Sequence, residues 1–213
     1  MVECLSPKAE SLIDNYLHIK VGPYVTPAPY YMNILSKRFS APVWVGKGLP
    51  GEIEIEANKI YQKFKPYFED SPSQGHSLLV NAGLGVDCSG LVNNILDAHL
   101  RETKGFGLVD AIATGVGLKW LLRKLRPRTS ISANDLTNDL NSVLIKRPDV
   151  VPGDLIRKGK YHVLLVEKVE RNKALVEITY IESATRPIYG VQRIVTTTDN
   201  LEYRRLKKMH EKN

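Results

Sequence analysis

Cys88 lies where an unassigned loop gives way to a segment with helical periodicity. Apolar residues at positions 88, 91, 92, 95 and 96 recur with the spacing of one helix face. Asp87 is a favourable N-cap, because its carboxylate can accept hydrogen bonds from free backbone N–H groups of the first turn. Cys88 would then be the first helical residue, where the positive end of the helix dipole favours the thiolate over the thiol. This position predicts a nucleophilic cysteine, and a small buried residue without reactivity is the alternative interpretation.

A nucleophilic thiol needs a base, and His162 is the best placed of the five histidines in the chain. It comes early in a predicted strand, residues 161–169, whose two faces are both apolar, so we expect this strand to be central and buried. His99 lies about 16 Å further along the cysteine helix and cannot reach the thiol. The next predicted strand, residues 174–183, has one face that is apolar except for Glu182. A buried carboxylate needs a partner, because an unpaired buried charge is strongly destabilising.

The predicted hairpin between these two strands brings His162 and Glu182 together. A three-residue loop over 171–173 sets the two residues directly opposite each other, with Cβ atoms about 4.5–5.5 Å apart. A two- or four-residue loop would place them on opposite faces of the sheet. In the predicted arrangement Glu182 orients one imidazole nitrogen, while the other accepts the thiol proton of Cys88. Free N–H groups at the helix start stabilise an oxyanion. The pattern predicts acyl transfer through a thioester, most simply amide hydrolysis.

The elements that hold these residues follow from the order of the periodic segments. Besides a basic amphipathic piece over 118–125, three helices are predicted, one beginning at Ser6-Pro7, one from Pro50 to about Phe68 and one from Cys88 to about His99. Four strands are predicted, at 161–169, 174–183, 191–197 and 203–206. The Gly46-Lys47-Gly48 triplet is interpreted as a turn, because it lacks the frame of a phosphate-binding loop. These elements predict an α+β protein with an antiparallel sheet in its C-terminal third.

Composition limits the class of protein further. A chain of 213 residues with 43% apolar residues suits one domain, or a domain with an extension. No apolar run approaches the roughly 20 residues of a membrane span, and the first residues lack the pattern of a signal peptide. We therefore expect a cytoplasmic protein, or one delivered outside by a non-classical, phage or secretion-system route. Two cysteines, Cys4 and Cys88, are too few for a disulfide framework, although a single bridge between them would abolish thiolate chemistry. No metal-ligand spacing is present, so neither a metal nor another cofactor is expected.

The formal charge of +7 is uneven along the chain. Residues 101–130 hold seven Lys or Arg against two acidic residues, and residues 201–213 hold five against two. Such clusters usually form a solvated face, and contact with an anionic polymer, a nucleic acid or a membrane surface is the functional alternative. No recognition motif supports nucleic-acid binding. The residues proposed for such a contact are Lys119, Arg123, Lys124 and Arg126.

Four short strings resemble the NlpC/P60 cysteine peptidases when they are taken in order. They are D-C-S-G-L-V at 87–92, P-G-D-L-I at 152–156, Y-H-V at 161–163 and Y-I-E-S at 180–183. The resemblance implies a papain-like α+β fold in which the cysteine helix packs on a small antiparallel sheet. It implies that Cys88 is the nucleophile and His162 the base, with Glu182 where the family commonly has another histidine. It further implies cleavage of amide bonds in peptidoglycan stem peptides, so the expected partner is a peptide or muropeptide substrate.

The resemblance covers residues 76–206, which we predict to be the catalytic domain, with a basic helical insertion over about 103–130. Residues 1–75 are predicted to be an N-terminal extension that ends at a polar break over 70–75, and residues 207–213 a basic tail. The family usually has an active-site tyrosine shortly before the cysteine, and residues 77–87 contain none. The role is then unfilled or taken by Asn81 or His76. The predicted supporting residues for the oxyanion are Asp87, Ser89 and Asn81.

These departures leave two other functions open. A binding module that keeps the fold without useful turnover would need neither the tyrosine nor a histidine at position 182. A cysteine acyltransferase would share the site and could act at a lipid surface through Trp120 and the basic helix.

Overall fold

The computed structural model describes residues 1–31, 40–65, 73–112, 125–172, 175–198 and 200–210. Its helices are α1 (Pro7–Leu17), α2 (Pro50–Phe64), α3 (Ser73–Ala82), α4 (Cys88–Lys104), α5 (Leu108–Ala111), α7 (Pro127–Ser130), α8 (Ala133–Thr137) and α9 (Lys207–His210), with 3-10 turns η2 (Pro42–Val45) and η4 (Arg147–Asp149). Its strands are β1 (Val2–Cys4), β2 (Ile19–Val21), β3 (Tyr24–Thr26), β4 (Ser142–Ile145), β5 (Leu155–Lys158), β6 (His162–Arg171), β7 (Val176–Ala184), β8 (Gly190–Thr196) and β9 (Glu202–Leu206). The predicted α+β class and the four predicted C-terminal strands are confirmed.

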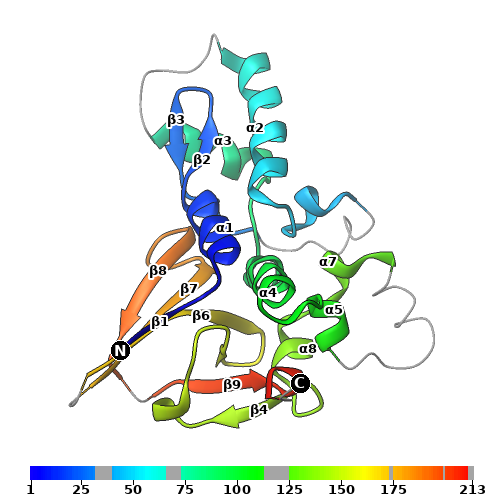
Figure 1. Cartoon of the computed structure of the whole chain (residues 1–213). Coiled ribbons are helices and arrows are strands. Elements are labelled where there is room, and N and C mark those ends of the chain that lie inside the picture. The colour runs from blue at the N-terminus through cyan, green and yellow to red at the C-terminus, as the bar shows by residue number, and fades with distance from the viewer. Residues whose placement is uncertain (32–39, 66–72, 113–124, 173–174, 199, 211–213) are drawn as a thin grey trace.

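The main sheet has seven strands in the described part of the chain, in the order β4-β9-β5-β6-β7-β8 with β1 added beside β6, and its pairs are antiparallel. One edge of β6 pairs with β7, and the other edge pairs first with β5 and then with β1. The N-terminal strand β1 therefore belongs to the same sheet as His162. Figure 1 shows α2, α3 and the β2–β3 hairpin as an upper lobe, with α4 between this lobe and the sheet.

The connection between β6 and β7 differs from the predicted hairpin. Arg171 pairs with Val176, so four residues join the two strands rather than the predicted three. A four-residue connection by itself would put His162 and Glu182 on opposite faces. A β-bulge between Val166 and Lys168 inserts Glu167 as one extra residue and restores the shared face.

His162 and Glu182 are consequently diagonal neighbours on one face. Leu165 pairs with Ile181, and continuing that register places His162 opposite Ala184, two residues beyond Glu182. The predicted direct opposition of His162 and Glu182 is therefore wrong, although diagonal neighbours on one face remain within reach of long side chains. The prediction missed the bulge because an apolar strand pattern does not reveal an inserted residue.

Helix α4 is the central helix of the fold. It begins with Asp87 as N-cap, whose carboxylate accepts from the Gly90 N–H at 2.6 Å, and it ends at Gly105, whose φ of +76° favours glycine. The predicted apolar face is buried, and so are Asn93 and Asn94 on the other side of the helix. The Asn93 amide donates to the Ile131 carbonyl and the Asn94 amide to the Tyr16 hydroxyl. Each buried amide nitrogen therefore has a hydrogen-bond partner.

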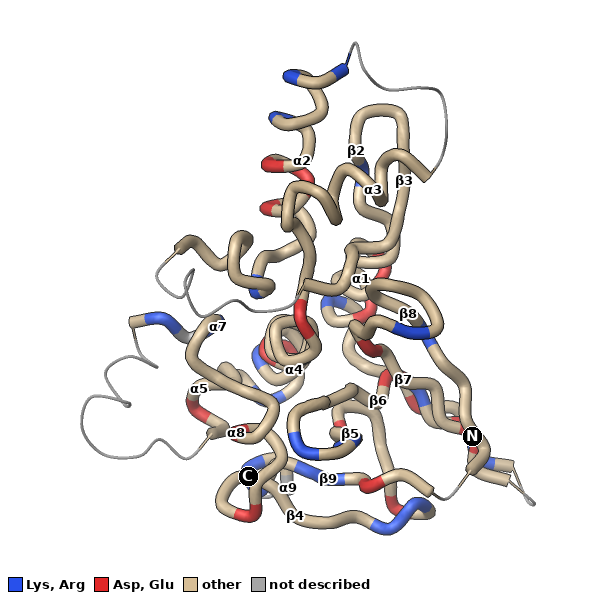
Figure 2. The backbone as a smooth tube through the Cα atoms, turned by 180° about the vertical axis from the view of Figure 1, so that it is seen from behind, with Lys and Arg blue, Asp and Glu red and all other residues tan. Residues whose placement is uncertain are grey.

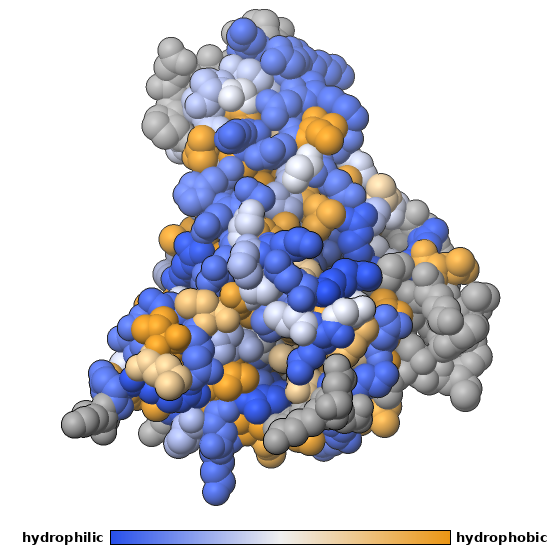
Figure 3. Space-filling view, in the orientation of Figure 1, coloured by the Kyte–Doolittle hydropathy of each residue, from blue (hydrophilic) through white to orange (hydrophobic). Residues whose placement is uncertain are grey.

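Both faces of β6 are buried, as the sequence predicts. Val163 and Leu165 pack into the larger core with α4, whereas Leu164 and Val166 belong to a second core on the opposite face. The strand that carries His162 is therefore packed against a core on each of its two faces. On the face of the molecule that Figure 3 presents, exposed apolar residues form separated patches among polar ones.

The first third of the chain contributes to the same core. Ile13 and Tyr16 of α1 and Ile53 of α2 are fully buried in the core that contains Cys88. Arg128 of the predicted insertion bonds to the carboxylate of Glu52 in α2 at 2.8 and 2.9 Å. Figure 2 shows acidic residues along the lower part of α2 and basic residues at its far end, which complements the helix dipole.

Other sequence expectations are corrected or fall outside the described residues. The polar break predicted over 70–75 extends too far, because α3 begins at Ser73. Gly75 belongs to that helix and packs closely on the neighbouring hairpin, where a Cβ on it would lie 2.7 Å from the Cβ of Tyr24. Of the proposed basic contact residues, Lys119, Arg123 and Lys124 lie outside the described residues, and Arg126 is exposed. None of the helices in the described residues combines the length and apolar character that a membrane span requires.

Candidate active site

Cys88 occupies the first position of α4, as the sequence predicts, and is 8% exposed. Its Sγ lies 3.7 Å from the carbonyl oxygen of Tyr161, the residue just before β6. Neither cysteine forms a disulfide: Cys88 is a free, buried thiol and Cys4 is a free, exposed one. The start of α4 is thus placed against the start of the strand that carries His162.

His162 links the thiol to a buried carboxylate. Its Nε2 lies 3.0 Å from Oε2 of Glu182, and its side chain is 24% exposed while that of Glu182 is 2% exposed. Burial alone would lower the pKa of His162, but hydrogen bonds with Cys88 and Glu182 outweigh burial and raise the pKa to about 9. The imidazole therefore favours the protonated form when the thiol and the carboxylate are its neighbours.

Glu182 is held by a residue that the sequence interpretation missed. Gln192 lies directly across from it in the β7–β8 pair, and its Nε2 donates to Oε1 of Glu182 at 3.0 Å. The same amide nitrogen donates to the carbonyl of Arg186 at 2.9 Å. Both carboxylate oxygens thus have partners, as a buried carboxylate requires. Only the pairing of β7 with β8 could have indicated Gln192.

The chain that leads into Cys88 runs between two segments from the first third of the sequence. Val86 forms a parallel bridge with Tyr30 and an antiparallel bridge with Lys47. The Asp87 N–H donates to the carbonyl of Gly46 at 2.9 Å. On the sheet side, the hydroxyl of Ser183 donates to the carbonyl of Val86 at 2.6 Å. Residues of the predicted N-terminal extension therefore hold the segment that leads into Cys88 in place.

Two of the predicted supporting residues, Asp87 and Ser89, form a buried cluster with Lys47. The ammonium of Lys47 lies 2.8 Å from Oδ1 of Asp87 and donates to the hydroxyl of Ser89. Ser89 donates to the same Asp87 oxygen at 3.0 Å. The sequence interpretation took Lys47 as part of a turn, and no local pattern marks it as buried, yet it is 3% exposed.

Tyr30, which bridges to Val86, lies within electrostatic range of Cys88. Burial and then the charges of Cys88 and Asp87 raise the pKa of Tyr30. Its ring contacts the Tyr189 ring edge-on at 6.0 Å between centroids, and a ring nitrogen of His76 lies 2.9 Å from the Tyr189 carbonyl oxygen. His76 thus contacts the backbone of Tyr189, whose ring packs against Tyr30.

Asn81 is exposed on α3, and its side chain forms no hydrogen bond with the part of the chain that the structure describes. The structure therefore does not join Asn81 to the thiol. The family pattern places a tyrosine within the dozen residues before the cysteine, whereas Tyr30 lies far earlier in the sequence.

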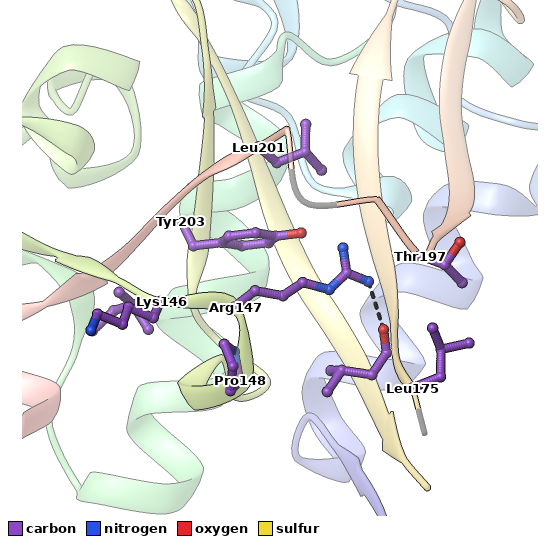
Figure 4. Close-up of a pocket in the computed structure, with 9 residues that line it drawn as sticks. Lys146, Arg147, Pro148, Leu175, Thr197, Leu201 and Tyr203 are labelled. Atoms are coloured by element: carbon purple, nitrogen blue, oxygen red, sulfur yellow. Dashed lines mark hydrogen bonds between the residues drawn. The ribbon is translucent and has the colours of Figure 1, made fainter. Parts of the chain in front are cut away.

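A cavity of about 570 Å³ lies elsewhere, between η4 and the far ends of β7 and β9. Its lining includes Arg147 and Tyr203 and none of the residues around the thiol. Figure 4 shows Arg147 extending across this cavity to a carbonyl on the opposite wall, which is that of Val176 at 2.6 Å. We place the candidate site at Cys88 rather than here, because a thiol, an imidazole and a buried carboxylate meet there. Within the described residues, no group of three or more His, Cys, Asp or Glu side chains could hold a metal ion.

No family model, curated protein or solved structure matches this chain. The similarity to NlpC/P60 peptidases therefore stays a prediction carried by the four strings and by the geometry around Cys88.

Proposed function

We propose that this protein is a cysteine hydrolase of the NlpC/P60 type that cleaves an amide bond through a thioester on Cys88. The observation that carries the proposal is the series Cys88–His162–Glu182, in which one imidazole contacts a thiol and a buried carboxylate. Nucleophile, base and orienting group in this order define covalent acyl transfer on many unrelated folds. The proposal includes a papain-like core, supported by the packing of α4 on the sheet strands β6 and β7.

The reaction follows from the positions of these groups. His162 takes the proton of the Cys88 thiol, and the thiolate attacks the carbonyl carbon of the amide. The first N–H groups of α4 have no acceptor within the helix, so that of Cys88 can stabilise the oxyanion. The imidazolium then protonates the leaving amine, and a thioester remains. Water, deprotonated by His162, hydrolyses the thioester and returns the thiol.

Glu182 and Tyr30 support these steps. Glu182 fixes the imidazole and stabilises the imidazolium, the role that a carboxylate has in Ser-His-Asp triads. Tyr30 comes from a different segment than the family pattern suggests. The charge of Cys88 contributes to raising the pKa of the Tyr30 phenol. The proposed substrate class, peptidoglycan-type peptides, rests on the resemblance alone.

Alkylation by iodoacetamide tests the activated thiol. Cys88 is expected to react faster than Cys4 below pH 7, and faster than the same residue in the chain unfolded by guanidinium. The unfolded reference is needed because partial burial and the charge of Glu10 raise the pKa of Cys4. Equal rates for Cys88 in the folded and unfolded chain would refute the activated nucleophile.

Mass spectrometry of muropeptides incubated with the protein tests the substrate class. Hydrolysis is expected to yield two fragments that together gain one water, and the Cys88→Ser variant is the matched control. An acyltransferase would instead be favoured if the acyl group is transferred to an added amine and no hydrolysis occurs when the amine is left out.

A further inference from the structure

We infer that Lys47 is a positioning residue that neutralises the carboxylate beside the nucleophile and so favours the thiolate of Cys88. The inference rests on the proposed function, because it assumes that Cys88 reacts as a thiolate. It concerns a residue far from Cys88 in the sequence, contributed by a segment that matches none of the strings of the resemblance.

The Asp87 carboxylate at the N-cap of α4 has two opposing effects, and Lys47 offsets the unfavourable one. Asp87 satisfies the Gly90 N–H with its carboxylate, which stabilises the start of the helix. The same negative charge lies on the residue adjacent to Cys88, where it opposes ionisation of the thiol. An ammonium on that carboxylate cancels the charge and leaves the hydrogen bond in place. The cap is thereby kept without its electrostatic effect on the nucleophile.

The backbone around Lys47 is fixed against α4 by several contacts. The carbonyls of Lys47 and Gly48 accept from the Asn94 amide at 3.3 and 3.4 Å. A Cβ on Gly90 would lie 2.2 Å from the Gly46 carbonyl oxygen and 3.0 Å from Cδ of Lys47. The glycine of the D-C-S-G string therefore allows the strap 46–48 to lie directly on the first turn of the helix.

Burial makes the pair of Lys47 and Asp87 an obligate one. The side chains are 4% and 10% exposed, so removal of either partner leaves an uncompensated charge next to the thiol. Other titratable groups also face the site, and the test must separate Lys47 from them. They are His162 on β6, Glu182 on β7 behind it, and Tyr30.

The test is the pH dependence of Cys88 alkylation by iodoacetamide in a charge cycle. Lys47→Met is expected to move the pH midpoint of the reaction upward by one unit or more, a tenfold loss of rate below the midpoint. Asp87→Asn, which keeps an oxygen for the cap, is expected to move the midpoint downward. The double variant is expected to return to within about threefold of the wild-type rate, because both charges are removed.

The matched control is Lys59→Met, which removes an exposed lysine that pairs with Glu56 on α2. It is expected to leave the midpoint unchanged. Shifts of Lys47→Met and Asp87→Asn in the same direction, or no shift in either, would overturn the inference. If Lys47→Met does not fold, the double variant and Asp87→Asn still differ by the lysine charge alone, and equal midpoints in these two would overturn it.

These results separate the inference from the proposed function. If wild-type Cys88 alkylates rapidly and His162→Ala abolishes the rate, the activated nucleophile stands whatever Lys47 does. If wild-type Cys88 is no faster than in the unfolded chain, the proposed function fails before the charge cycle is measured.

Discussion

The two ends of α4 have different roles in the fold. At its first turn the helix presents Cys88 to His162, and Lys47 neutralises the cap. At its other end the helix holds α1, because His99 accepts from the Ser6 N–H at 3.1 Å and a neighbouring carboxylate, Glu102, accepts from the Lys8 N–H at 2.9 Å. One helix thus carries the candidate chemistry at its start and caps a second helix at its end.

The two histidines at these ends show what decides their pKa values. Both are partly buried, and burial by itself lowers the pKa of each. The partners of His162 are a thiol and a buried carboxylate, which raise its pKa to about 9. Nδ1 of His99 instead accepts from a backbone N–H, and burial lowers the pKa of His99 despite the opposing charge of Glu102. The partner, rather than burial, makes one histidine a candidate base and the other a neutral cap.

The largest expected effect separates the two histidines by reactivity. His162→Ala is expected to lower the alkylation rate of Cys88 at pH 7 by about a hundredfold, because the thiol loses its base. His99→Ala is the matched control, since this residue lies at the other end of the helix, and it should leave the rate within about twofold. Similar rates in both variants would remove the distinction between the ends.

Replacement of the glycine at each end of α4 is expected to lower the free energy of unfolding by different amounts. Gly90→Ala forces a Cβ to within 2.2 Å of the Gly46 carbonyl oxygen and is expected to cost about 2–3 kcal/mol of unfolding free energy. Gly105→Ala meets open space and only the strain of φ +76°, about 1 kcal/mol. Denaturant unfolding of both variants measures the difference. An equal cost would show that the strap can move away from the helix.

Removal of the carboxylate partner is expected to have a smaller effect on reactivity. Glu182→Gln keeps the shape of the side chain but not its charge, and we expect about a tenfold slower alkylation, less than the loss of His162 itself. The pKa of His162, followed by NMR, should fall below its wild-type value. Glu102→Gln is the control at the far end of α4. An unchanged His162 titration in Glu182→Gln would show that the thiol alone raises that pKa.

The smallest expected effect is a pH-dependent stability from His99. Because folding lowers its pKa, the unfolded chain binds the proton more readily. The contribution of His99 is therefore present above about pH 6.5, the unfolded value, and is lost as the pH falls through the folded pKa. His99→Phe removes the acceptor of the Ser6 N–H and should cost about 1 kcal/mol at pH 7.5.

Denaturant unfolding at pH 7.5 and at pH 5 measures this difference, which should be smaller at pH 5. A cost that stays the same at both values would contradict a neutral His99 cap. His162 has the opposite sign. Its raised pKa gives a contribution present below about pH 6.5 and lost as the pH rises through about 9.

Much of the candidate site could be predicted because its signals are local. The cap at Asp87, the first helical position of Cys88 and the buried strand of His162 all follow from periodicity and capping chemistry over a few residues. The need of Glu182 for a partner followed from its place on an apolar face. The predicted contact with His162 is present, although by a route that differs from the one expected.

That route shows where prediction from a strand pattern fails. The connection has four residues instead of three, and the bulge at Glu167 compensates for the difference. Glu167 is buried and pairs with Arg193 of β8. The bulge is thus accompanied by a contact from another strand, which no pattern along β6 contains.

The sequence by itself determined the chemistry of the individual residues and the elements that carry them. Helix and strand periods depend on neighbours a few positions apart, so Cys88, His162 and Glu182 could be assigned to a helix start and two strands. The tertiary structure alone decided which distant groups complete the site. Lys47 reaches Asp87 across 40 positions, and Gln192 depends on the pairing of β7 with β8. A buried ion pair between distant segments forms only when packing excludes water from both charges, and that depends on the whole fold.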